Sequence, residues 1–242
     1  MRTREWLKST DPGAMLWDVS ANATLHPDAP EAFARPALRR LLLFVLHVFR
    51  PLIEQTDIPT CRAAAELAWQ LADGTAATDT MPQTRAALSA DYDATWEASR
   101  QYHEMPRELA TRMDVLNVLA RLLDNPATAA RNVFPPDATP ALVTGSTLPI
   151  DSARACALLR EIFGERGRLL VEPEWRAEWR TDTVLALARQ MYDSEQFGAM
   201  PILADALQDA GCDNAKVLAH CRDPKATHVR GCWVIDTVLG KV

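Results

Sequence analysis

Five side chains that can bind a metal or act as nucleophiles lie within residues 211–233, in the stretch GCDNAKVLAHCRDPKATHVRGCW. Thiolate and imidazole groups are ligands that zinc prefers in tetrahedral sites. The spacing argues against such a site, because no two cysteines are arranged as C-x-x-C and the first histidine directly precedes a cysteine. A zinc or iron site is therefore the alternative interpretation of this segment. Its candidate ligands are Cys212, His220, Cys221, His228 and Cys232.

Packing is the favoured interpretation of these cysteines. On a helix, Cys221 shares a face with Val217 and Leu218, and Cys232 leads into Ile235 at helical spacing. Free cysteine is among the most buried residue types and behaves as a small hydrophobe. We therefore predict core thiols and no cofactor.

A catalytic thiol is a further alternative for the same segment. It requires a lowered pKa and a nearby base. Cys212 follows Gly211 and precedes a helix for which Asp213 is the expected N-cap, and His220 or His228 is a candidate base. No known nucleophile signature surrounds any of these thiols, so we favour a protein that is not an enzyme.

Two carboxylates, Asp205 and Asp209, share one face of an expected helix and form another candidate ion site. Such carboxylates more often form a solvated edge or pair with an arginine of a neighbouring helix. Leu203 and Leu207 are expected to point into the core instead. We favour the solvated edge.

Two tryptophans, Trp175 and Trp179, are expected on one face of a short helix in EPEWRAEW, next to Arg176 and Arg180. Stacked arginine and tryptophan can form a ligand platform. In so short a segment the indoles are better explained as anchors that bury a large area against the main bundle.

We predict a structural role for the stretch HVRGCW, which would fix the final helix to the rest of the fold. Gly231 separates a polar turn from a final apolar helix, and Trp233 follows where that helix must dock. His228, in the polar turn, is expected to contact a backbone carbonyl or a carboxylate such as that of Asp223.

The elements that position these residues are predicted to be helices throughout. The chain has only nine glycines, and alternating β-branched residues are hard to find. A long helix is expected from Pro36, with a break or kink at Pro51, and another is expected to end at Gly74. The predicted fold is an all-α multi-helix bundle with long N-terminal helices and a compact C-terminal module of short ones.

A proline-rich segment divides the chain. Residues 125–149 contain five prolines and almost no charge, which indicates a linker or an extended strap. The expected organisation is an N-terminal helical region at 1–124, this segment at 125–150 and a helical module at 151–242. The alternative is that the two helical parts pack as one domain.

The composition of the chain indicates which classes of partner and which cellular compartment to expect. The 26 basic and 32 acidic residues are spread along the chain without a basic patch, so nucleic acid is not an expected partner. The most apolar run, Leu41 to Phe49, is far shorter than the ~20 residues of a membrane span, so no membrane partner is expected. The N-terminus lacks a signal-peptide pattern, and five irregularly spaced cysteines suit a reducing compartment. We expect a cytoplasmic protein.

Two parts of the chain resemble a known family. The string PILADALQDAGCDNAKVLAHCRDPKATHVRGCWVIDTVLGKV is similar to the C-terminal module of alanine-rich proteins of planctomycetes, especially Gemmata-like bacteria, and EWLKSTDPGAML resembles the opening of the same proteins. The resemblance implies a bacterial cytoplasmic protein but no particular activity. Its members place a cysteine cluster where this chain has LLLFVLHVF, which contains no cysteine.

Sequence alone favours a non-enzymatic helical module that binds another protein. Helical bundles offer apolar grooves to partner helices, and no phosphate-binding or catalytic motif is present. The alternative is a small zinc or iron protein, or a hydrolase, with its site in residues 205–232.

Overall fold

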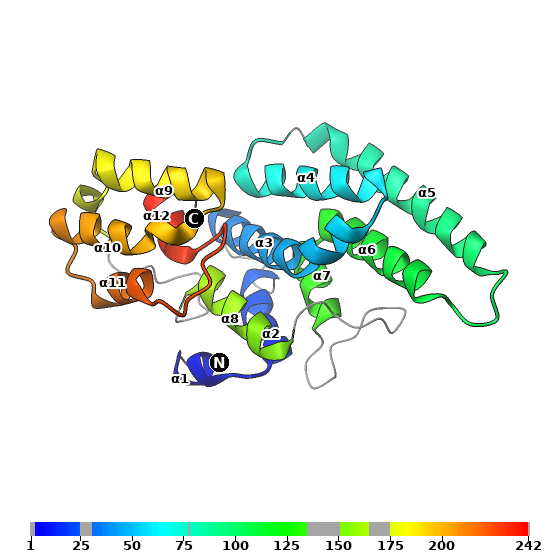
Figure 1. Ribbon diagram of the computed structural model, residues 1–242, viewed down its shortest axis with the longest axis horizontal. Coiled ribbons are helices and arrows are strands. Elements are labelled where there is room, and N and C mark those ends of the chain that lie inside the picture. Colours follow the sequence, from blue (N-terminus) through cyan, green and yellow to red (C-terminus); the bar gives the residue numbers. More distant parts are fainter. Residues whose placement is uncertain (1–2, 25–30, 77, 135–150, 165–174, 242) are drawn as a thin grey trace.

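The structure, a computed structural model, describes residues 3–24, 31–76, 78–134, 151–164 and 175–241. These residues form α-helices and short 3-10 helices and contain no strand, which confirms the predicted all-α fold (Figure 1). The first eight helices are α1 (Thr3–Lys8), α2 (Pro12–Thr24), α3 (Glu31–Gln55), α4 (Pro59–Asp73), α5 (Met81–Ser99), α6 (Arg107–Asp124), α7 (Pro126–Val133) and α8 (Ser152–Phe163), with the 3-10 helix η1 (Thr78–Thr80) before α5. The remaining elements are η2 (Ala177–Trp179), α9 (Asp182–Ser194), η3 (Phe197–Ala199), α10 (Met200–Asp209), α11 (Ala215–Arg222) and α12 (Trp233–Leu239).

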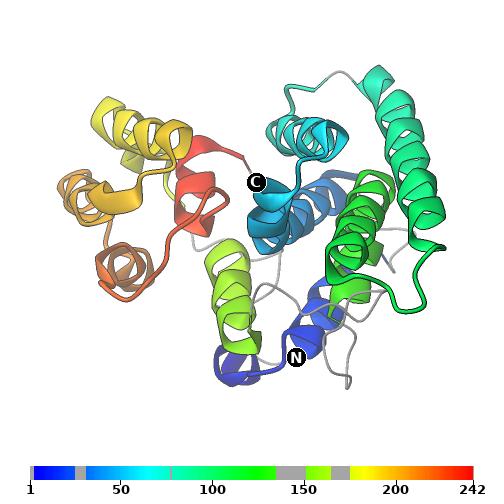
Figure 2. The ribbon, with the colours of Figure 1, turned by 45° about the vertical axis from the view of Figure 1, so that its right-hand side comes forward.

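The buried apolar side chains form two cores. The first core is built around α3, which contacts α2, α4, α6, α7 and α8. The second core lies in residues 179–238, where α12 packs against α9 and α11. Helix α8 follows the proline-rich segment in sequence but belongs to the first core, and it also touches α12. Figure 2 shows α8 between the N-terminal helices and the C-terminal module, a name used below for residues 175–241.

Helix α3 is longer and more continuous than the sequence indicates. It begins at Glu31, before the predicted start at Pro36, and it continues through Pro51 to Gln55. A proline in a helix interior removes one backbone hydrogen bond, which is why a break or a kink was expected; the structure shows no break. Phe49 and Ile53 are buried in the first core on either side of Pro51, and their packing holds the last turns in helical form.

The expected linker at 125–150 begins with a helix instead. In α7, the side chain of Asn125 accepts a hydrogen bond from the backbone N–H of Thr128 at 3.0 Å, and Pro126 occupies the first turn, where its missing N–H costs nothing. Ala130 and Val133 bury α7 in the first core. The rest of the predicted linker, 135–150, lies outside the described residues.

Two expectations about the C-terminal module are wrong. The stretch containing Trp175 and Trp179 is not an α-helix; only η2 forms there, and the two rings meet edge to face at 5.3 Å. Trp179 is buried in the second core, so it anchors the module itself rather than attaching it to the main bundle. The N-cap of α11 is Asn214, whose side chain accepts from the backbone N–H groups of Lys216 and Val217, and not Asp213.

A buried polar network joins the two cores. Asp73, the last residue of α4, accepts hydrogen bonds from Tyr192, Arg230 and Lys241 of the C-terminal module, with Lys241 Nζ at 3.1 Å. Burial acts to raise the pKa of Asp73, but the hydrogen bonds from Tyr192 and Lys241 and the nearby positive charges lower it overall. Arg39 of α3 pairs with the fully buried Asp236 of α12. The C-terminal module is therefore attached to α3 and α4 by ionic contacts.

None of the helices in the described ranges combines the length and the apolar character that a membrane span requires.

Candidate metal centre

Four side chains that can bind a metal meet between α8 and the C-terminal module. They are Glu161 on α8, His220 on α11, His228 in the following loop and Cys232 at the N-cap of α12. One ligand atom from each side chain lies within 4.8 Å of all the others. We call these four residues the donor cluster.

The separations within the donor cluster are close to those of a coordination shell. His228 Nδ1 lies 3.0 Å from Glu161 Oε1, and His220 Nε2 lies 3.5 Å from Glu161 Oε2 and 3.3 Å from Cys232 Sγ. With zinc–ligand bonds of about 2.0–2.3 Å, tetrahedral geometry places neighbouring ligand atoms about 3.3–3.8 Å apart. These three separations are close to that range, and because the full set of ligand atoms lies within 4.8 Å, enclosing a zinc ion requires some of them to approach one another by up to about 1 Å.

The donor cluster combines a carboxyl group whose pKa is lowered with a thiol whose pKa is raised. Burial acts to raise the pKa of Glu161, but hydrogen bonds with His220 and His228 outweigh it and lower the pKa to about 2. Burial, together with the charge of Glu161, raises the pKa of Cys232 well above its usual value. A bound metal ion deprotonates a coordinating thiol, so metal binding would release the Cys232 proton.

The local sequence of α8 explains the position of Glu161. Asp151 caps the helix by accepting a hydrogen bond from the backbone N–H of Arg154 at 2.7 Å. Leu159 and Ile162 are buried in the first core, and Glu161, between them, is 5% exposed. Helix α8 ends at Gly164, whose φ of 72° favours glycine.

Glycine at 231 positions the Cys232 end of the cluster. Gly231 has a φ of 98°, and a Cβ at this position would lie 2.8 Å from Cδ1 of Leu43 in α3. The positive φ favours glycine, and a larger residue would also have to displace this methyl group of Leu43. The next two residues are Cys232 and Trp233; the indole of Trp233 packs over Gly164 and lies 5.1 Å from the ring of His220.

The structure brings together three of the residues singled out in the sequence, His220, His228 and Cys232. The other candidates lie outside the donor cluster. Cys212 and Cys221 are buried in the second core, as predicted, and burial, then the charge of Glu161, raises the pKa of Cys221 to about 12. Asp205 is exposed and pairs with Arg222 of the neighbouring α11 at 2.6 Å, and Asp209 is also exposed, as expected for a solvated edge.

Two features of the cluster differ from the sequence interpretation. The carboxylate beside His228 is that of Glu161 and not of Asp223, which instead accepts a hydrogen bond from the backbone N–H of Lys225 at 2.9 Å. Glu161 itself was not among the candidates. The one signal in the sequence was an acidic side chain between two apolar residues, Leu159 and Ile162, on an amphipathic helix, and that pattern is common without a site.

A cavity of about 660 Å³ adjoins the donor cluster. Glu161 and His220 belong to its lining, and so does Trp233. The cluster can therefore be reached from this cavity.

Comparison of the chain with protein-family models, with curated proteins and with solved structures finds no match.

Proposed function

We propose that the protein binds one zinc ion through Glu161, His220, His228 and Cys232. The observation that supports this proposal is the convergence of four ligand atoms within 4.8 Å, from segments separated by up to about seventy residues in the chain. Four protein ligands around one zinc ion are typical of structural sites. Zinc would then fasten α8, which belongs to the first core, to α11 and α12 of the C-terminal module.

The donor types favour zinc over other common ions. Magnesium and calcium select oxygen ligands, whereas this cluster offers two imidazoles, one thiol and one carboxylate. The competing explanation is a buried polar network without a metal, in which Glu161 and His228 are simply hydrogen-bonded to each other. That network would not require the sulfur of Cys232, which lies 3.3 Å from His220 Nε2.

Elemental analysis of protein purified without a metal-affinity tag tests the proposal. We expect about one zinc per chain in the parent protein and close to none in Cys232→Ala and His228→Ala, because loss of one of four ligands weakens binding strongly. Cys212→Ala is the matched control, since Cys212 is a buried free thiol outside the donor cluster. Parent protein that stays metal-free after zinc is offered, or a control that loses as much zinc as Cys232→Ala, would reject the site.

Cobalt substitution gives an independent test of the ligands. Cobalt(II) bound to a cysteine sulfur shows a thiolate charge-transfer absorption, which we expect in the parent and in Cys212→Ala. Cys232→Ala should lack this band, since its remaining donors are nitrogen and oxygen. A band that survives in Cys232→Ala would show that a different cysteine binds the metal.

We also propose a reducing bacterial cytoplasm as the compartment. All five cysteines are free and buried, and free thiols persist in reducing compartments. The resemblance to planctomycete proteins supports the same location.

A protein-binding role is the second proposal, and it is supported by exposed apolar side chains around the connection between α5 and α6. Trp96 is 52% exposed, Tyr102 50% and Met105 36%, at the end of the molecule opposite the C-terminal module (Figure 1). Exposed aromatic residues of this kind are enriched at protein interfaces. A pull-down with parent protein and with a Trp96→Ser, Tyr102→Ser double variant tests it: a partner captured equally by both would exclude this surface.

A further inference from the structure

The cavity beside the donor cluster has the construction of a ligand site. Its walls are faces of three helices, each contributing residues at i, i+3, i+4 and i+7 spacing, and its volume of about 660 Å³ lies within the range of small-molecule pockets. The four positions are 47, 50, 51 and 54 on α3; 154, 157, 158 and 161 on α8; and 216, 219 and 220 on α11, with 223 at its C-cap.

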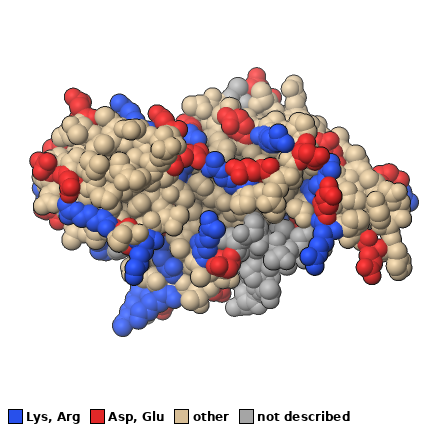
Figure 3. All heavy atoms as spheres, viewed as in Figure 1, with Lys and Arg blue, Asp and Glu red and all other residues tan. Residues whose placement is uncertain are grey.

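The lining of this cavity carries more positive than negative charge. Five basic side chains, Arg50, Arg154, Arg160, Lys216 and Lys225, face three acidic ones, Glu54, Glu161 and Asp223. In Figure 3, Lys and Arg gather along the lower left of the molecule, the side on which α1, α8 and α11 lie. A concave, low-dielectric surface concentrates such a field and attracts anions.

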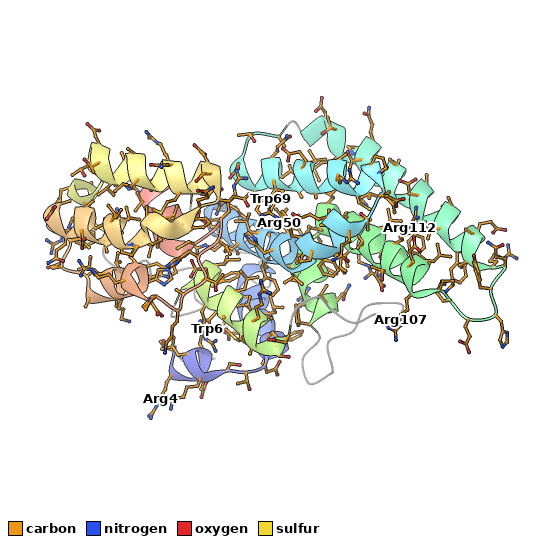
Figure 4. The ribbon with its side chains drawn as sticks, viewed as in Figure 1. Arg4, Trp6, Arg50, Trp69, Arg107 and Arg112 are labelled. Carbon is orange, nitrogen blue, oxygen red and sulfur yellow. The ribbon has the colours of Figure 1, made fainter. Side chains whose placement is uncertain are left out.

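One of these cations is fixed in position. The guanidinium of Arg160 donates to the carbonyl oxygens of Trp6 and Ser9, at 3.2 Å for Trp6, and no carboxylate within the described ranges forms an ion pair with it. Trp6 lies on the side of α1 that faces α8, and Arg50 lies on α3 above α8 (Figure 4). Arg50, in contrast, pairs with Glu54 at 2.9 Å and with Glu195.

Two further cations are available to a ligand. Arg154 and Lys225 are exposed, and among the residues that the structure describes neither side chain has an ion-pair partner. They extend from α8 and from the loop after α11, on two walls of the cavity. Together with Arg160 they place three positive charges in the lining of this cavity.

The remaining lining is apolar. Leu7, Val48 and Leu158 contribute aliphatic surface, and Trp233 contributes an indole that is 8% exposed. An aromatic ring beside basic groups suits a ligand with a planar or apolar body and a charged end.

We propose that this cavity binds a small organic anion, with a phosphate or carboxylate held by Arg154, Arg160 and Lys225 and an apolar body against Leu158 and Trp233. The inference goes beyond the zinc proposal and does not require it, because the anion-binding residues are not metal ligands. Glu161 and His220 are the two residues that the cavity and the donor cluster share.

Calorimetric titration of the full chain with phenyl phosphate tests the proposal, and benzoate, inorganic phosphate and phenol are the comparison probes. We expect saturable binding of about one phenyl phosphate or one benzoate per chain; the tighter of the two identifies the preferred anionic group. Phosphate, which lacks the apolar body, and phenol, which lacks the charge, should bind at least about tenfold more weakly. Arg154→Gln and Lys225→Gln should each weaken binding about tenfold, the effect of one lost charge-assisted hydrogen bond.

Arg189→Gln is the matched control, because Arg189 is an exposed arginine on α9, outside the cavity lining. All titrations are made with chelator and again with one equivalent of zinc, so that failure of the zinc proposal does not affect the result. The anion site is overturned if neither organic anion binds saturably in either state. It is also overturned if phenol binds as tightly as phenyl phosphate, or if Arg154→Gln and Lys225→Gln behave like Arg189→Gln.

Discussion

Trp233 contacts several parts of the candidate site. Its ring packs on Gly164 at the end of α8, lies 5.1 Å from the ring of His220 and lines the cavity. This one side chain therefore links α8, α11 and α12.

Replacement of Trp233 by alanine should destabilise the protein by about 3–5 kcal/mol, the usual cost of emptying a buried aromatic site. Urea unfolding with chelator present measures this loss apart from any metal effect. Trp96→Ala is the control: Trp96 is 52% exposed, so a change within about 0.5 kcal/mol is expected there. Equal stability of Trp233→Ala and the parent would mean that the ring is not part of the core.

The burial of individual residues was predictable, but their partners across the fold were not. Helical spacing correctly placed Cys221 and Cys232 in the interior, since periodicity reports which face of a helix is covered. The meeting of Glu161 with His228 depends on how α8 docks against a loop 67 residues later in the chain. Local spacing carries no information on that docking.

At the scale of elements, the turn before α12 sets the geometry of the donor cluster. Gly231 combines a positive φ with close approach to Leu43, whereas Gly211 has a φ of 86° with open space around it. Both positions would strain a residue other than glycine, but only Gly231 has a close steric neighbour. Comparing substitutions at the two glycines therefore distinguishes the cost of backbone strain from the cost of steric contact.

Gly211→Ala should lower the free energy of unfolding by about 1–2 kcal/mol, because alanine is strained in the left-handed backbone conformation that glycine adopts there. Gly231→Ala should cost more, by about 1–3 kcal/mol, because its Cβ also overlaps Leu43 in a packed core. Denaturant unfolding gives both values, and zinc content should fall in Gly231→Ala alone. Equal losses in the two variants would show that the contact with Leu43 does not constrain this turn.

Helix ends marked by glycine could be read from the sequence more reliably than those marked by proline. Gly74, Gly164 and Gly240 end helices with positive φ as expected, because this conformation favours glycine whatever the tertiary context. Proline was the misleading signal. The first-core packing of Ile53 and of Val133 sustains helix at Pro51 and after Pro126, and such packing cannot be seen from local composition.

At the scale of the whole molecule, the C-terminal module is attached to α4 by the ionic network around Asp73. Arg230 and Lys241 also lie over the ring of Tyr192, at 4.6 Å and 4.5 Å from its centroid. The proline-rich segment suggested a division before α8, but the two cores divide after it, because α8 buries Leu159 and Ile162 among the N-terminal helices.

Asp73→Asn should lower the free energy of unfolding by about 2 kcal/mol at pH 7, the order of a hydrogen bond to a charged group. The folded protein lowers the pKa of Asp73 from its ordinary value of 3.8. Its stabilising contribution is therefore complete above the ordinary pKa and is lost as the pH falls through the lowered folded value. The difference between parent and variant should shrink below about pH 4.

Unfolding curves at a series of pH values measure this difference. Asp124→Asn is the control, because the exposed pair of Asp124 with Arg85 should contribute no more than about 1 kcal/mol. A difference for Asp73→Asn that stays constant from pH 7 down to pH 3 would show that the carboxylate charge does not hold the module.

The place of α8 in the chain has a consequence for biosynthesis. A ribosome releases Glu161 before it has made His220, His228 or Cys232, so this carboxylate spends part of translation without its imidazole neighbours. An ionised group resists burial until its partners arrive, and we expect α8 to dock firmly only after residue 232 has emerged. Protease sensitivity of α8 in stalled nascent chains, ending before and after that residue, would reveal this order of assembly.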